Sequence, residues 1–96
     1  MDKKELKEKY KTLFAIVKEA VDEWDPYGLL KMGAPKDEFE SEVAQICPLV
    51  AKSGDADELA KHIKHVFDTM FEPIFKIDEC KKVAEKILRD AHEAKI

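Results

Sequence analysis

Glycine, proline and cysteine are all scarce: the 96 residues include three glycines, four prolines and two cysteines. The chain also has no low-complexity tract and no internal repeat. Two cysteines are too few for the disulfide framework of a small secreted domain. We therefore expect Cys47 and Cys80 to be free thiols on apolar helix faces, in a protein of the reducing cytoplasm.

Long hydrophobic runs are absent as well. The longest one, residues 13–17, is far too short to span a bilayer. The start of the chain is too rich in charged residues for a secretory signal peptide. These two observations lead us to expect a cytoplasmic protein with no membrane partner.

The chain has no excess of positive charge: its net charge is −4 and its pI is about 5.4. General nucleic-acid binding requires a field opposite in sign to that of phosphate, so this balance argues against it. The negative charge is concentrated in residues 22–42, where seven acids and two lysines give −5. The acids are Asp22, Glu23, Asp25, Asp37, Glu38, Glu40 and Glu42.

The chain does contain a regular helical pattern. Apolar residues make up 45% of it and charged residues 40%, which is typical of a globular protein. Apolar positions recur at steps of three and four, and their faces include Tyr10 and Met70. With no strand signal, we expect one all-α domain over residues 1–96, with four helices in an irregular, partly orthogonal array. The predicted helices cover about 3–23, about 41–52, from Asp55 to a stop at Pro73, and about 79–93.

Local signals predict where the helices begin and break. Ser41 and Asp78 are the expected N-caps of the second and fourth helices. Asp55, followed three residues later by Glu58, resembles a capping box at the start of the third helix. Pro48 lies inside the second helix, so that helix is expected either to kink there or to form two short pieces.

A long loop is expected between the first and second helices, over residues 24–37. Its start, residues 25–28, fits either a type I turn or a helix start with Asp25 as the N-cap. A short helical turn ending at Gly33 is also possible. The loop is too apolar for disorder, so we expect it to be ordered and packed on the helices. Three of its apolar residues either cover the core or form a dimer patch, so the oligomeric state stays open: Leu29, Leu30 and Met32.

The sequence offers little for catalysis. No hydroxyl or thiol stands in a nucleophile motif, and no glycine-rich phosphate loop precedes a helix. The acids Asp37 to Glu42 are explained by the positive end of a helix dipole without any acid–base role. We therefore expect a protein that is not an enzyme and uses no cofactor.

The third helix carries candidate residues for two further function classes. His62 and His65, with Glu58, form a candidate set of ligands for a metal or another small ligand, although His65 points almost opposite to the core. The second and third helices also resemble a helix-turn-helix, with Lys61 and Lys64 facing outward. A single arginine in the chain argues against base readout by such a motif.

Two short blocks in the loop carry a family resemblance. Residues 24–29 read Trp-Asp-Pro-Tyr-Gly-Leu, and residues 33–39 read Gly-Ala-Pro-Lys-Asp-Glu-Phe. They resemble the YugE-like family of small bacterial helical proteins, although Tyr27 and Phe39 depart from its usual pattern. The resemblance implies a compact all-α fold and supplies no function, because the family is a domain of unknown function. Its signature maps onto Trp24, Asp25, Pro26, Gly28, Pro35, Asp37 and Glu38.

This signature has a structural and a functional interpretation. In the structural one, Trp24 anchors the loop, Asp25 caps a turn, and Asp37 and Glu38 bind loop amides or the start of the second helix. In the functional one, an ordered aromatic loop rimmed by acids binds a partner. Our leading hypothesis is a non-enzymatic interaction module that binds another protein through the acidic loop, defined as residues 24–42.

Overall fold

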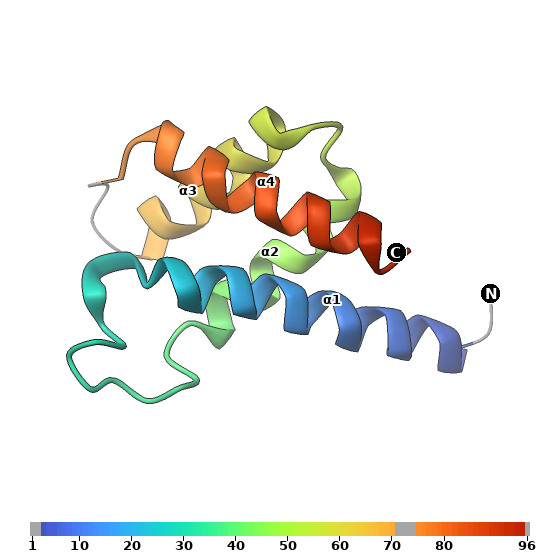
Figure 1. Ribbon diagram of the computed structural model, residues 1–96, viewed down its shortest axis with the longest axis horizontal. Helices are drawn as coiled ribbons and strands as arrows, with labels where there is room; N and C mark the ends of the chain where they lie inside the picture. Colours follow the sequence, from blue (N-terminus) through green and yellow to red (C-terminus); the bar gives the residue numbers. More distant parts are fainter. Residues whose placement is uncertain (1–2, 71–74, 96) are drawn as a thin grey trace.

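The apolar periodicity of the sequence becomes four α-helices in the computed structural model, which describes residues 3–70 and 75–95 (Figure 1). No strand occurs within these two ranges, so the predicted all-α class is confirmed. The predicted stop at Pro73 lies outside the described residues. The elements are α1 (Lys3–Trp24), the short 3-10 helix η1 (Pro26–Gly28), α2 (Glu40–Lys52), α3 (Ala56–Met70) and α4 (Ile77–Glu93).

The helices form an irregular array. α1 and α4 lie side by side and antiparallel, while α2 and α3 run obliquely behind them (Figure 1). The loop between α1 and α2 lies at one end of the molecule. The beginning of α1 and the end of α4 meet at the opposite end, where Glu5, Glu8 and Lys95 line a common hollow. Within the described ranges, no helix is long and apolar enough to cross a membrane.

The core is built from one face of every helix. Each fully buried aliphatic or aromatic side chain contributes about 1.5–3 kcal/mol relative to an exposed one. Two side chains that were expected to face inward do not: Tyr10 is 49% exposed and Met70 is 46% exposed. Tyr10 lies in the first half of α1, and Met70 is the last residue of α3. The largest buried apolar side chains are Val17, Val21, Phe39, Val43, Ile46, Leu59, Ile63, Phe67 and Ile87.

The start of α2 differs from the prediction. The helix begins at Glu40 with Phe39 as N-cap residue, so Ser41 is not the N-cap. The Phe39 side chain is fully buried and packs on Phe67, with ring centroids 6.2 Å apart. Burial of an aromatic ring therefore fixes where this helix begins, at the expense of a polar cap.

The start of α4 differs in the same way. The helix begins at Ile77 after Lys76, whose backbone is extended, so the predicted N-cap Asp78 lies in the first turn instead. A carboxylate is favourable in that turn because of the positive end of the helix dipole. Asp78 was correctly interpreted as a signal for the start of a helix, but the N-cap residue lies two positions earlier, at Lys76.

The capping box at the start of α3 is confirmed. The backbone amide of Glu58 donates to Oδ1 of Asp55 at 2.9 Å. The Glu58 carboxylate reaches back and accepts a hydrogen bond from the amide of Gly54, also at 2.9 Å. Both ends of the box thus satisfy amides that have no partner within the helix.

α2 continues without interruption through Pro48, so the prediction of two short pieces is wrong. Pro48 is exposed, and its missing amide removes one bond from the helix ladder. The neighbouring thiol Cys47 and the thiol of Cys80 on α4 are both free and buried, as predicted. Burial raises the pKa of each thiol to about 11.

Candidate functional site

The acidic loop is held in shape by Asp25. Its carboxylate accepts hydrogen bonds from the backbone amides of Leu30, at 2.9 Å, and Lys31, at 3.1 Å. Asp25 is the N-cap residue of η1 with Pro26 at its start, so that alternative is confirmed, although the Asp25 side chain makes no capping hydrogen bond to this short helix. Asp25 instead satisfies amides in the turn that follows, and its own backbone is left-handed, with φ 48°.

The turn over residues 25–28 is not the expected type I turn. The amide of Gly28 donates to the carbonyl of Asp25 at 2.9 Å, and Tyr27 at the third position has φ 66° and ψ 2°. A positive φ at this position is the mark of a type II turn, which usually places glycine there. The Tyr27 ring packs edge-on against Phe75, with centroids 4.6 Å apart. This contact offsets the strain of holding a tyrosine in the left-handed region.

The short helical turn predicted to end at Gly33 is present. The amide of Ala34 donates to the carbonyl of Leu29 at 3.0 Å, and that of Gly33 donates to Leu30 at 3.1 Å. This pair of bonds is a Schellman motif, with Gly33 at the left-handed position and φ 98°. Leu29 and Leu30 pack against the core, while Met32 is 74% exposed.

A lysine that the sequence did not single out fixes the second half of the acidic loop. The Lys18 ammonium on α1 donates to the carbonyl of Lys36 at 2.7 Å and to the Asp22 carboxylate at 2.6 Å. Lys18 and Lys36 are 18 positions apart, so helical periodicity carries no signal of this bond. The loop is therefore tied to α1 at both its beginning and its end.

The remaining signature acids have no such structural role. Asp37 is exposed and Glu38 is half-buried. Within residues 3–70 and 75–95, neither side chain makes a hydrogen bond or an ion pair. The predicted bonding of these two acids to loop amides or to α2 is therefore wrong, whereas the anchoring and turn-forming roles of Trp24, Pro26 and Gly28 hold. Pro35 is exposed.

Glu42 behaves differently from the other acids of the loop. It lies in the first turn of α2 and only 3% of it is exposed. Its Oε2 atom is buried and accepts no hydrogen bond from any residue that the structure describes. The sequence grouped Glu42 with the other acids of this stretch, since nothing in the local pattern shows that its side chain is buried.

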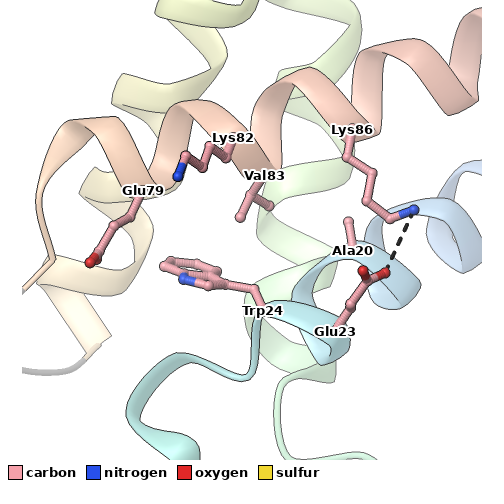
Figure 2. A pocket seen from close by; sticks show the side chains of 7 residues that line it. All are labelled: Ala20, Glu23, Trp24, Glu79, Lys82, Val83 and Lys86. Carbon is pink, nitrogen blue, oxygen red and sulfur yellow. Dashed lines mark ion pairs between the residues drawn. The ribbon is translucent and has the colours of Figure 1, made fainter.

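A second feature lies beside the acidic loop, between α1 and α4. It is an open groove of about 350 Å³, which we call the Trp24 groove (Figure 2). The Trp24 indole packs on its inner side against Phe67, with centroids 5.3 Å apart, and against Phe75 at 4.9 Å. Trp24 thus joins the loop, the core and the groove. The groove is lined by Ala20, Glu23, Trp24, Glu79, Lys82, Val83 and Lys86.

The lining of the Trp24 groove holds two acids and two lysines, and further acids stand beside it around Lys86. Among the described residues, the Lys86 ammonium lies within 4 Å of three carboxylates: Asp90 at 3.1 Å, Glu23 at 3.7 Å and Glu19 at 3.9 Å. The pKa of Lys86 is raised, first by its hydrogen bond to Asp90 and then by these neighbouring charges. The side chains of Glu19 and Glu23 remain 71% and 70% exposed, so both carboxylates also face solvent.

The candidate metal ligands are only partly brought together. His62 Nε2 lies 3.9 Å from Glu58 Oε1, while the other oxygen of Glu58 is occupied by the α3 capping box. His65 is exposed. No group of three potential ligands suited to a metal occurs in the part of the chain that the structure describes.

The helix-turn-helix candidate keeps few free positive charges. α2 and α3 are joined by a short turn, as expected. Lys64 pairs with Asp68 at 2.8 Å. Lys61 and His65 are exposed on α3. The pairing of Lys64 lowers the positive potential that this face could present to phosphate.

Comparison with known proteins adds a family and a relative. The sequence model of a family described as "Domain of unknown function (DUF1871)" matches residues 16–95. The chain is 35% identical over 65 residues to a protein described as "Uncharacterized protein YugE" from Bacillus subtilis (strain 168). That match covers 68% of this chain and 70% of the relative. No solved structure matches the chain.

Proposed function

We propose that this chain, which belongs to the DUF1871 family, is a non-enzymatic protein-interaction module. The description of the family names no activity, so the proposal is argued from the surface of the chain itself. The proposed binding surface is the acidic loop, residues 24–42. One observation carries the proposal. The side chains of Asp37 and Glu38 make no hydrogen bond or ion pair with the described residues, although they stand on a loop that other residues hold in place.

A loop that is already ordered is suited to binding because little conformational freedom is lost when a partner docks. Asp25 fixes the first half of the acidic loop, and Lys18 fixes the second half. Between these two points, Met32 presents an exposed apolar side chain. An apolar side chain surrounded by polar groups is the usual composition of an interface.

The charge of the acidic loop indicates the sign of the partner. The acidic loop has five acids and two lysines, a charge of −3, and the adjoining Asp22 and Glu23 bring residues 22–42 to −5, against −4 for the whole chain. A field of this sign accelerates encounter with a basic surface and slows encounter with an acidic one. The proposed partner is therefore a protein with a basic patch.

Affinity capture from a lysate of the source cells tests the proposal. The baits are the native protein, an Asp37→Lys/Glu38→Lys variant and a Glu85→Lys/Glu93→Lys control. The control changes the net charge equally, and it does so on the exposed face of α4. Far-UV circular dichroism first establishes that all three are folded.

We expect one protein to be retained by the native bait and the α4 control and to be lost from the loop variant. Retention by all three baits would show that the loop acids are not the binding site. Loss from both variants would show that only overall charge matters, and it would also contradict the proposal.

A further inference from the structure

We propose that the Trp24 groove receives an apolar side chain from a basic amphipathic helix of the partner, whose lysines or arginines pair with Glu19 and Glu23. This inference rests on the proposed interaction function and names the chemistry of the partner. It also adds a second contact surface beside the acidic loop.

The shape of the groove suits a side chain carried on a helix. Its floor is formed by Ala20, Trp24 and Val83, and its walls are two antiparallel helices (Figure 2). A volume of about 350 Å³ lies at the small end of the range for binding pockets. Amphipathic helices bind in such grooves by inserting side chains from one face, spaced by three or four residues.

Trp24 is well placed to be the main contact. It is half-buried, it lines the groove, and its inner side is fixed by Phe67 and Phe75. A rigid tryptophan loses little entropy on binding, and tryptophan is enriched among the residues that dominate interface energies. It is also the only tryptophan in the chain, so its fluorescence reports on this groove alone.

The charges of the rim favour a basic occupant. Lys86 is already surrounded by Asp90, Glu23 and Glu19, and Arg89 lies 3.6 Å from Asp90, which leaves a local excess of one negative charge on the side of Glu19 and Glu23. Glu19 and Glu23 stand one helical turn apart on the open edge of α1. Two basic side chains of a partner helix at the same i, i+4 spacing would face both carboxylates. A second copy of this chain is a poorer fit because its net charge is also negative.

The Lys82 ammonium on the same rim does not reverse this balance. Lys82 is exposed on α4, and Glu79 one turn earlier supplies a compensating carboxylate. Glu79 and Lys82 therefore cancel, while the α1 edge remains acidic. A small organic anion would be attracted by Lys82 and repelled by that edge.

The test uses two synthetic peptides without aromatic residues. One contains only leucine and lysine, with leucines at positions i, i+3, i+4 and i+7, and the other has glutamate in place of each lysine. Trp24 emission is followed during titration of the full chain. Amide chemical shifts measured by NMR locate the binding surface, and a Glu19→Arg/Glu23→Arg variant tests the rim charges.

We expect the leucine–lysine peptide to shift Trp24 emission to shorter wavelength and to saturate at one peptide per chain. The glutamate peptide should not bind. The Glu19→Arg/Glu23→Arg variant should weaken binding by about tenfold or more, because two attractive contacts become repulsive. Amide shifts should be largest around Ala20, Lys82 and Val83.

Three results would overturn the inference: no saturable change in emission, equal binding of the glutamate peptide, or unchanged binding by the Glu19→Arg/Glu23→Arg variant. A concentration-dependent emission of the protein alone would identify a second copy as the occupant of the groove and would overturn the inference too.

The groove inference and the loop proposal can fail independently of each other. If peptide binding is absent while loop reversal still abolishes capture of the cellular partner, only the groove inference falls. If the peptide binds and loop reversal leaves capture intact, only the loop proposal falls.

Discussion

The Trp24 indole meets the Phe67 ring nearly at a right angle, with an interplanar angle of 82° and centroids 5.3 Å apart. This edge-to-face contact ties the end of α1 to α3. Trp24→Ala is expected to lower the free energy of unfolding by about 3 kcal/mol, because a large ring packed on the core is lost. Trp24→Phe keeps a ring and should cost about 1 kcal/mol. Urea unfolding followed by circular dichroism measures both, and equal losses for the two variants would contradict this role.

The turn formed around Asp25 gives a second prediction. Asp25→Ala removes the acceptor for the amides of Leu30 and Lys31 and should lower the free energy of unfolding by about 1–2 kcal/mol. Asp25→Asn is the matched control, since asparagine keeps one acceptor oxygen and tolerates a positive φ. It should lose about half as much. An alanine variant as stable as the native protein would show that these bonds do not support the fold.

Gly33→Ala and Gly54→Ala are a matched pair of substitutions that separates backbone strain from side-chain crowding. Gly33 has φ 98°, and a Cβ there would meet no other atom within 4 Å, so Gly33→Ala suffers from backbone strain alone. We expect a loss of about 1–2 kcal/mol in thermal or urea unfolding. Gly54 lies outside the left-handed region, and an added Cβ would meet only the flexible Glu58 carboxylate at 3.3 Å. Gly54→Ala should therefore change stability by less than about 0.5 kcal/mol. Similar losses at both positions would rule out strain as the cause.

Pro48 should be a site where stability can be gained. It is exposed in the interior of α2, so Pro48→Ala removes no core contact and restores an amide that can donate to the carbonyl of Ala44. We expect the free energy of unfolding to rise by about 1–3 kcal/mol in urea titration. Gln45→Ala, at an exposed position of the same helix, should change it by less than about 0.5 kcal/mol. A destabilised Pro48→Ala variant would mean that the proline fits α2 better than this geometry implies.

The buried thiols predict how stability changes at alkaline pH. The pKa of Cys47 and Cys80 is raised from 9.0 to about 11 in the folded protein. Between these values the unfolded chain has lost protons that the folded chain still holds, so stability falls as the pH rises. The slope should approach about 1.4 kcal/mol per pH unit for each thiol. Urea unfolding at pH 8, 9 and 10 measures it, and the Cys47→Ala/Cys80→Ala variant corrects for lysine and tyrosine titration. An equal slope in that variant would exclude the thiols as the cause.

The parts of the fold that could be predicted from sequence are those set by local physics. Helical periodicity located all four helices, and the Asp55–Glu58 capping box was correct because its bonds span three or four residues. The predicted N-caps Ser41 and Asp78 misplaced two helix starts, and for α2 the reason is tertiary. At α2, the burial of Phe39 outweighed the preference for a polar cap, and such burial depends on elements distant in sequence.

The candidate site was predicted only in part. The signature marked Trp24 and Asp25, and both hold the acidic loop in shape. The bond from Lys18 to Lys36 and the groove between α1 and α4 were missed, since each depends on how helices pack. The positive φ of Tyr27 was missed as well, because turn preferences assign that conformation to glycine.

Because α1 begins and α4 ends at the same pole of the molecule, opposite the acidic loop, both attachment points for a fused reporter lie away from the proposed surface (Figure 1). A chip-coupled chain held by either end would present its loop to the flowing solution. A fluorescent protein joined at that pole and a quencher-labelled partner bound at the acidic loop would stand at opposite ends of a molecule whose long axis measures 39 Å. Energy transfer between them would then report how far the labelled site of the partner lies from that pole.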